Sequence, residues 1–248
     1  MTRRLDGAGI VVTRPTGAAD RLAQLLAAAG ARLLAFPAFR LVPIETSVPA
    51  GDFDAALFTS PAAVRFGWAH LAGARPKTLL APGSGTRASL VAAGATEVQI
   101  PARGAGLAAL LDSLSADWLT GKRLLVVCGE PPNRANLREL EALSAAVTPF
   151  PVYARRAAQD ARPLSAWIRA GEVDAIMASS VAAVAVLDTL LGENSRKLDW
   201  IVSSERVAGE AERRGVKPFA VAASAEAGDM AAAAVHWWQS KDAHDRRA

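Results

Sequence analysis

Hydroxyl-bearing residues recur in this chain where predicted strands end and predicted helices begin. Each follows a short apolar run and precedes a stretch of helical character. A hydroxyl beside the free N–H groups of a helix start can cap that helix or bind a carboxylate. A single turn of this kind is typical of a simple cap, but a set at one sheet edge favours a site for an anionic ligand. The residues are Thr13, Thr59, Ser60, Ser84, Thr86, Ser179, Ser180, Ser203 and Ser204.

Two of these turns belong to an internal repeat. The stretch at 53–64, FDAALFTSPAAV, returns at 173–184 as VDAIMASSVAAV. Both copies read as a buried strand, a tight turn with a hydroxyl pair, and a helix start. Neighbouring segments also recur. Residues 10–39 resemble 125–153, and residues 79–94 resemble 199–215. The sequence therefore predicts two related halves.

The alternation of strands with helices predicts an α/β fold with two similar doubly wound parallel-sheet domains. If each domain needs one copy of each kind of repeat unit, the chain must cross between domains twice. The two Phe-Pro segments, within the extended stretches 33–44 and 150–155, supply the crossings, and proline there suits an edge strand. We expect a discontinuous first domain (1–36 plus 155–248), a second domain (41–150), and a two-stranded linker (37–40 and 151–154). The tail from Ser240 onward is expected to be disordered.

Composition limits the class of protein. Apolar residues make up 51% of the chain, yet no apolar run has the length that a membrane span needs. The start of the chain has no pattern of a signal peptide. One cysteine, Cys128, excludes an internal disulfide and suits a reducing compartment. We expect a cytoplasmic monomer without a membrane partner.

Charge indicates an acidic small molecule rather than nucleic acid. The net charge is +4, and the basic residues are scattered without a nucleic-acid-binding motif. Most of the arginines are expected to lie on solvated helix faces. The excess of positive charge still suits a ligand that carries carboxylates.

Cofactor and metal sites are not predicted. The turn at 83–88, GSGTRA, is a loose dinucleotide-binding pattern, but the next predicted strand, a short one at 97–101, ends without the acidic residue that such a site needs. Its counterpart in the repeat, at 203–206, lacks the glycines. The three histidines do not have the spacing of metal ligands.

Tyr153 and Cys128 are the candidates for covalent or acid–base chemistry. Tyr153 is the only tyrosine, and its counterpart in the repeat is Phe39, so it either packs at the crossing or offers a hydroxyl. Cys128 takes the place of Thr13 in the repeat and has no histidine near it in sequence. A small buried side chain is therefore favoured over a nucleophile.

These segments together resemble the uroporphyrinogen-III synthase family over nearly the whole chain. The resemblance is carried by VTRP at 12–15, FTSPAAV at 58–64, GSGTRASL at 83–90, CGEPPNRANL at 128–137 with VYAR at 152–155, and VSSERVA at 202–208. Some members have a threonine pair where this chain has Ser203 and Ser204.

The resemblance implies two doubly wound domains with a two-stranded linker, no cofactor, and the linear tetrapyrrole hydroxymethylbilane as substrate. The reaction loses water, closes the macrocycle and inverts ring D through a spiro intermediate. Tyr153 matches the family tyrosine that helps the hydroxyl depart, and a phenol can donate to a leaving hydroxyl. A cytoplasmic two-domain small-molecule binder or regulator without catalytic activity is the alternative.

The resemblance and the turns together give the expected substrate-binding residues. They are Thr13, Arg14, Pro15, Thr59, Ser60, Pro61, Ser84, Gly85, Thr86, Gly129, Glu130, Arg134, Ser179, Ser180, Ser203 and Ser204.

Overall fold

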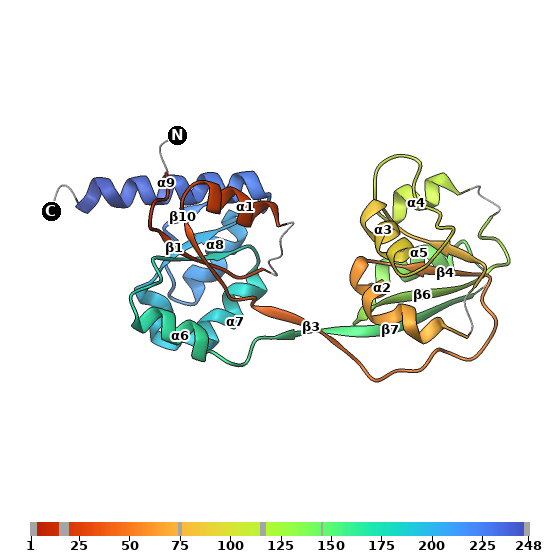
Figure 1. Cartoon of the computed structure of the whole chain (residues 1–248). Coiled ribbons are helices and arrows are strands. Elements are labelled where there is room, and N and C mark those ends of the chain that lie inside the picture. Colours follow the sequence, from red (N-terminus) through yellow and green to blue (C-terminus); the bar gives the residue numbers. More distant parts are fainter. Residues whose placement is uncertain (1–3, 15–19, 74–75, 115–117, 145, 246–248) are drawn as a thin grey trace. The chain divides into compact units, whose positions relative to one another are not determined.

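The computed structural model describes residues 4–14, 20–73, 76–114, 118–144 and 146–245. The chain divides into two compact units, of which unit 1 contains residues 1–40 and 157–248, and unit 2 contains residues 41–156 (Figure 1). Both units are built from strands that alternate with helices along the chain. The α/β fold that the sequence predicts is confirmed. Within the described ranges, no helix combines the length and the apolar character that a bilayer crossing needs.

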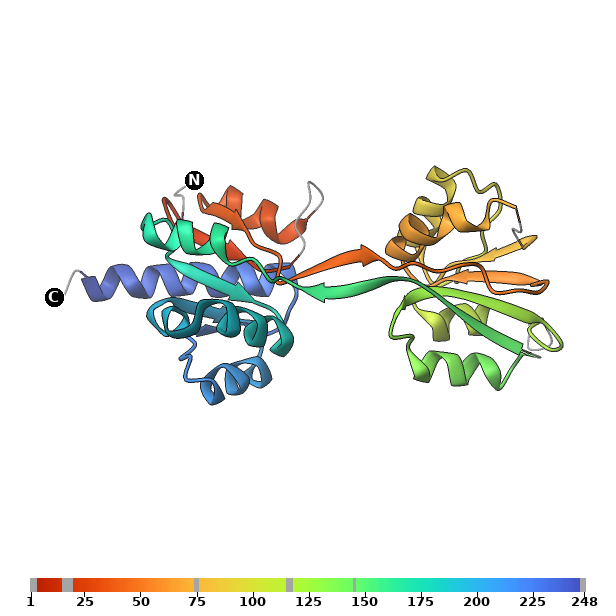
Figure 2. The same ribbon diagram turned by 90° about the horizontal axis from the view of Figure 1, so that it is seen from below.

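Unit 1 holds a parallel sheet in the order β10-β9-β8-β1-β2, with helices on both faces. Alternate residues of β1 point to opposite faces, so Val11 packs in one core while Ile10 and Val12 pack in the other. Helices α1 and α9 lie side by side on the second face (Figure 2). The elements are β1 (Gly9–Val12), α1 (Arg21–Ala28), β2 (Arg32–Ala35), α6 (Arg162–Arg169), β8 (Ala175–Ala178), α7 (Val181–Leu191), η2 (Gly192–Lys197), β9 (Asp199–Val202), α8 (Glu205–Arg213), β10 (Ala220–Val221) and α9 (Ala227–Asp245).

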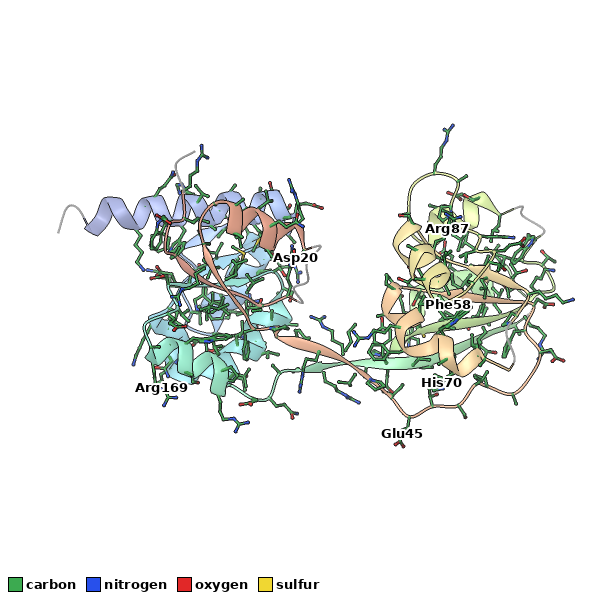
Figure 3. All side chains as sticks on the ribbon, viewed as in Figure 1. Asp20, Glu45, Phe58, His70, Arg87 and Arg169 are labelled. Atoms are coloured by element: carbon green, nitrogen blue, oxygen red, sulfur yellow. The ribbon has the colours of Figure 1, made fainter. Side chains whose placement is uncertain are left out.

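Unit 2 holds a sheet in the order β3-β7-β6-β4-β5, in which β7, β6, β4 and β5 are parallel. Phe58, labelled in Figure 3, is fully buried in the core under α2 and α3, and Leu57 faces the core under α4 and α5. The elements are β3 (Phe39–Pro43), β4 (Ala55–Phe58), α2 (Pro61–Gly67), η1 (Trp68–Leu71), β5 (Thr78–Leu80), α3 (Ser84–Ala92), α4 (Leu107–Ser113), β6 (Arg123–Glu130), α5 (Arg134–Glu141) and β7 (Ala146–Ala157).

The two sheets use the repeated strands in the same spatial order. β1 pairs with β8 in one sheet, and its repeat counterpart β6 pairs with β4 in the other. Each sheet therefore takes one strand of each repeated kind. The match extends to the sheet edge. In unit 1, β10 pairs with β9, and in unit 2, Gln99 forms a bridge to Leu80 of β5, the counterpart of β9. The short strand expected at 97–101 is wrong, because the pairing there is this single bridge.

Three further boundaries differ from the sequence-based expectation. The extended segment at 33–44 forms two strands, β2 and β3, each at the edge of a different sheet. The strand expected at 150–155 is the longer β7, which covers twelve residues. Disorder was expected from Ser240 onward, but α9 continues to Asp245.

Close packing of α2 against the sheet depends on Gly67. A Cβ atom at this position would lie 2.5 Å from Val127 Cγ1 and 3.2 Å from Val152 Cγ2. The absence of a side chain lets the end of α2 approach β6 and β7 directly. The opposite end of the same helix begins after Ser60.

We expect Gly67→Ala to lower the free energy of unfolding by about 1–3 kcal/mol, because the methyl group overpacks the contact between α2 and the sheet. Urea denaturation followed by circular dichroism measures this change. Gly228→Ala is the matched control, since its added Cβ meets nothing within 4 Å in α9. That substitution is expected to stabilise by up to about 1 kcal/mol. Equal effects of the two substitutions would contradict the packing argument.

Candidate active site

A pocket of about 390 Å³ lies in unit 2 at the carboxyl ends of β4 and β6. This is the edge at which open α/β sheets place their ligands. The pocket joins the turn after β4, the end of β6 and the middle of β7. Its polar lining residues are Thr59, Ser60, Cys128, Gly129, Glu130, Asn133, Asn136, Tyr153 and Arg155.

A bulge in β7 places Tyr153 opposite Gly129. Cys128 pairs with Pro151, but the next residue, Gly129, pairs with Tyr153, so Val152 is the extra residue. A bulge of this kind changes which side chains of the strand share a face. Val152 is buried in the core below α2, while Tyr153 lines the pocket. Without this shift in register, Val152 would stand opposite Gly129.

Gly129 leaves room for the tyrosine ring. A Cβ atom on Gly129 would lie 2.8 Å from Tyr153 Cζ and 3.0 Å from the phenolic oxygen. Any other residue would therefore displace the ring or the strand. Gly129 was predicted to bind substrate, and its geometric role is to support the ring of Tyr153.

Ser60 is the hydrogen-bonding partner of Tyr153. The Ser60 Oγ lies 3.3 Å from the phenolic oxygen, and either hydroxyl can be the donor. Ser60 Oγ also accepts the N–H of Ala63 at 3.1 Å, which caps α2. On another side the ring of Phe66 packs against the tyrosine with centroids 5.6 Å apart. Tyr153 is held on several sides, with its hydroxyl group at the pocket.

The remaining predicted residues of this turn and of β6 have varied roles. Thr59 lines the pocket, and its hydroxyl donates to the carbonyl of Val127 at 3.1 Å. Glu130 lies 3.8 Å from Arg156. Pro61 occupies the first turn of α2. Arg134 lies outside this pocket and lines an adjoining hollow of about 430 Å³ with Arg138.

The turn before α3 lies apart from the Tyr153 pocket. Gly83 occupies the N-cap position of α3, so Ser84 is the first residue of the helix rather than its cap. Thr86 is buried in the first turn of α3. Ser84, Gly85 and Thr86 are all absent from the lining of the Tyr153 pocket.

In unit 1, two of the predicted hydroxyls tie neighbouring strand ends together. The Thr13 hydroxyl donates to Met177 O at 2.8 Å, and the Ser203 hydroxyl donates to Ser179 O at 3.1 Å. Both residues are buried. Their hydroxyl hydrogens are used inside the protein, so these side chains cannot be simple donors to a ligand.

The other two serines of unit 1 occupy helix N-caps. Ser180 Oγ accepts the N–H of Ala183 at 3.2 Å and caps α7. Ser204 has the N-cap position of α8, and among the described residues its side chain makes no capping hydrogen bond. The Ser204 hydroxyl and the first N–H groups of α8 suit an anionic group, but the acidic Glu205 in the same turn competes with it.

Arg14 is committed to an ion pair with Asp20, which caps α1. Asp20 is labelled in Figure 3. The Arg14 Nη2 lies 2.8 Å from Asp20 Oδ1. Burial tends to raise the pKa of Asp20, but the hydrogen bond and charge of Arg14, with the N–H groups of Leu22 and Ala23, lower it below its usual value. Pro15 lies outside the described residues.

Sequence reasoning missed several lining residues. Asn133 caps α5 by accepting the N–H of Ala135 at 3.0 Å, and Asn136 follows on the same helix. Leu41 comes from β3 and Arg155 from β7. The stretch EPPN at 130–133 was the available signal, since it begins α5 at the carboxyl end of β6.

Cys128 is a buried side chain rather than a reactive one. It is 5% exposed and packs with residues under α4 and α5. Burial raises the pKa of its thiol to about 11, and a weaker opposing effect comes from a backbone hydrogen bond with Phe150. In the described part of the chain, the His, Cys, Asp and Glu side chains form no group of three that could hold a metal ion.

The fold and the pocket define an α/β protein of two related units whose polar groups gather where parallel strands end. A family model described as uroporphyrinogen-III synthase HemD matches residues 20–232. The chain belongs to the uroporphyrinogen-III synthase family.

Solved structures of synthases are similar to this chain. Uroporphyrinogen-III synthetase from Helicobacter pylori is 13% identical, with 92% of this chain and 99% of that chain covered and a TM-score of 0.58. A mutant uroporphyrinogen III synthase from the extremely thermophilic bacterium Thermus thermophilus is 21% identical, with 94% and 100% covered and a TM-score of 0.44. A comparison with curated proteins finds no match. The Helicobacter structure shows that the fold is shared.

We expect Cys128 to resist alkylation by iodoacetamide at neutral pH in the folded protein and to react readily in urea. The thiolate is the nucleophile, and a thiol with a pKa of about 11 is almost wholly protonated at neutral pH. Mass spectrometry of the labelled chain measures the extent of reaction. Rapid labelling of the folded protein would contradict both the burial and the raised pKa.

Proposed function

We propose that this protein is a uroporphyrinogen-III synthase, a cyclising hydro-lyase that converts hydroxymethylbilane into uroporphyrinogen III with inversion of ring D and loss of water. The proposal depends above all on the family match across residues 20–232. The site supports it, because the pocket in unit 2 presents a phenolic hydroxyl beside the ends of β4 and β6. In this proposal the protein is a cytoplasmic monomer that works without a cofactor.

Binding of the substrate is proposed to be spread over many turns. Hydroxymethylbilane carries acetate and propionate arms, and carboxylates are stabilised by the first N–H groups of a helix. The starts of α3, α7 and α8 offer such groups with Ser84, Ser180 and Ser204 beside them. The net charge of +4 favours the same ligand.

Tyr153 is proposed to assist departure of the substrate hydroxyl. As the carbon–oxygen bond breaks, the phenol donates to the leaving oxygen, which departs as water, while the pyrrole nitrogen stabilises the positive charge left on carbon. The substituted carbon of ring D then attacks to form the spiro intermediate, which rearranges to the inverted macrocycle. Bound carboxylate arms hold the chain so that this carbon, rather than the unsubstituted one, attacks.

We also propose that residues 37–40 and 151–154 form a two-stranded linker between a domain of 1–36 with 155–248 and a domain of 41–150. Hydrogen bonds on either side support this proposal, since Ala158 N–H donates to Ala38 O at 2.9 Å and Ile44 N–H donates to Val152 O at 3.3 Å. The earlier residue of one segment is paired with the later residue of the other, so the segments are antiparallel. Such a pair can bend while it resists twisting more than one strand would.

Supplying hydroxymethylbilane and separating the products tests the proposed function. Spontaneous closure gives the type I isomer, so the enzyme is expected to direct the product to type III. Formation of the type I isomer alone, at the rate measured without protein, would overturn the proposal. A protein that bound the substrate but left only type I would instead be a non-catalytic small-molecule binder.

We expect Tyr153→Phe to lower the rate of type III formation by about 10²-fold or less while the fold is kept. Positioned acid catalysis contributes about 10²–10⁴-fold, and here the pyrrole nitrogen and water can replace part of it. The ring still packs against Phe66, so the urea midpoint should change little. Turnover corrected for spontaneous type I gives the answer, and a wild-type rate would reduce Tyr153 to a packing role.

A further inference from the structure

Three features of unit 2 converge on the hydroxyl of Tyr153. The bulge at Val152 turns the side chain toward the pocket, and Gly129 leaves space beneath the ring. Ser60 places its hydroxyl 3.3 Å from the phenolic oxygen. This distance is longer than is usual between two hydroxyls, as is common for catalytic hydrogen bonds before substrate binds.

The related turn of unit 1 shows which of these features the fold itself requires. Ser180 caps α7 through the N–H of Ala183 just as Ser60 caps α2 through the N–H of Ala63. In the sequence repeat, however, Phe39 stands in the place of Tyr153. Phe39 packs beside the apolar core of unit 1. A serine cap of this kind therefore does not require a tyrosine.

The position of Gly129 leads to the same conclusion. Its counterpart in the repeat is Arg14, which follows β1 as Gly129 follows the buried part of β6. The parallel sheet of unit 1 forms with this large residue in place. The glycine of unit 2 is thus explained by the ring that lies against it and not by the strand.

The direction of the Ser60–Tyr153 hydrogen bond decides what the phenol can do. Ser60 Oγ already accepts a backbone N–H, and its single hydrogen is free to point to the phenolic oxygen. The Tyr153 hydrogen is then available to the pocket. A chain of donors results, from Ala63 N–H through Ser60 to Tyr153, and hydrogen bonds in such a chain polarise one another.

We propose that Ser60 is a positioning residue that donates its hydroxyl hydrogen to Tyr153, so that the phenol directs its own hydrogen toward the departing hydroxyl of the substrate. Gly129 is the second part of the same arrangement, because it fixes the height of the ring above β6. Ser60 was expected to bind substrate, and this inference gives it an indirect role instead. The inference about Ser60 rests on the proposed function in the tests that measure turnover, and the spectroscopic test does not depend on that function.

Turnover of Ser60 variants with hydroxymethylbilane tests the positioning role. We expect Ser60→Ala to lower kcat for type III formation by about two- to tenfold, the loss of one hydrogen bond, with KM little changed. Ser60→Thr should retain the rate, since threonine both caps the helix and donates. A raised KM with unchanged kcat would overturn the proposal and make Ser60 a substrate contact.

A double-mutant cycle shows whether Ser60 acts through Tyr153. In the Tyr153→Phe background there is no phenol to orient, so adding Ser60→Ala should lower kcat no further. If kcat of the double variant falls by the product of the two single reductions, the inference is overturned. Ser180→Ala, which removes the matching cap in unit 1, controls for the loss of stability when both proteins are denatured in urea.

A spectroscopic test separates this inference from the proposed function, because it needs no turnover. Tyr153 is the only tyrosine, so the Raman Fermi doublet of tyrosine reports on this phenol alone. Its intensity ratio responds to whether the phenolic oxygen accepts or donates. We expect Ser60→Ala to shift the ratio toward a donor, and Ser60→Asp to shift it further, because a carboxylate can only accept. An unchanged ratio in both variants would overturn the hydrogen-bond direction.

Gly129→Ala tests the second part. The added Cβ would lie within 3.0 Å of two ring carbons and the phenolic oxygen of Tyr153, so the phenol must move. We expect a lower kcat and a changed Fermi doublet in the variant, with the changes in kcat largely absent when Tyr153 is already phenylalanine and the hydroxyl is gone. A variant with the wild-type doublet and rate would show that the height of the ring is unimportant.

Discussion

The structure of the site depends on one close contact, that of the tyrosine ring with a strand residue that has no side chain. A Cβ on Gly129 would lie 2.8 Å from Tyr153 Cζ, so glycine is needed wherever the ring stays in this place. The ring reaches that place only because Val152 is an extra residue in β7. Ser60 meets the phenol from the start of α2, and the other end of this helix packs closely on β6 and β7 at Gly67. Backbone features, rather than charges, therefore set the position of the one candidate acid.

The duplicated fold separates what the architecture needs from what the chemistry needs. Four strands of each sheet have the same order, β9-β8-β1-β2 in one and β5-β4-β6-β7 in the other. Both sheets also place a serine cap after the equivalent strand, at Ser60 and Ser180. The tyrosine, the glycine beneath it and the bulge are features of unit 2, while Arg14 and Phe39 take the equivalent places in unit 1. The same sheet therefore forms with either group of residues, so the phenol of unit 2 is not required by the fold.

The sequence predicted the fold well because the spacing of apolar residues indicates which segments are strands and which are helices. Four-residue apolar strands followed by hydroxyls and alanine-rich helices gave the parallel sheets, and the repeat indicated which strands share a sheet. The bulge at Val152 could not be predicted, because an extra residue leaves no mark on composition or hydropathy. Nor could the sequence show that Gly129 supports a ring contributed by β7, since that contact joins two separate strands.

The hydroxyls that drew attention in the sequence differ in what they have left to offer. Thr13, Thr59 and Ser203 donate to carbonyls of neighbouring strand ends, so each links two strands at the sheet edge. Their removal would loosen the edge before it weakened a ligand contact. Ser204 and the first N–H groups of α8 keep their capacity for an anion. A substrate with many carboxylates suits such an edge, because backbone N–H groups bind it without any single side chain carrying the affinity. In the proposed mechanism, selectivity for the ring D carbon arises from many weak contacts to one flexible substrate, and the phenol has only to assist the departure of water.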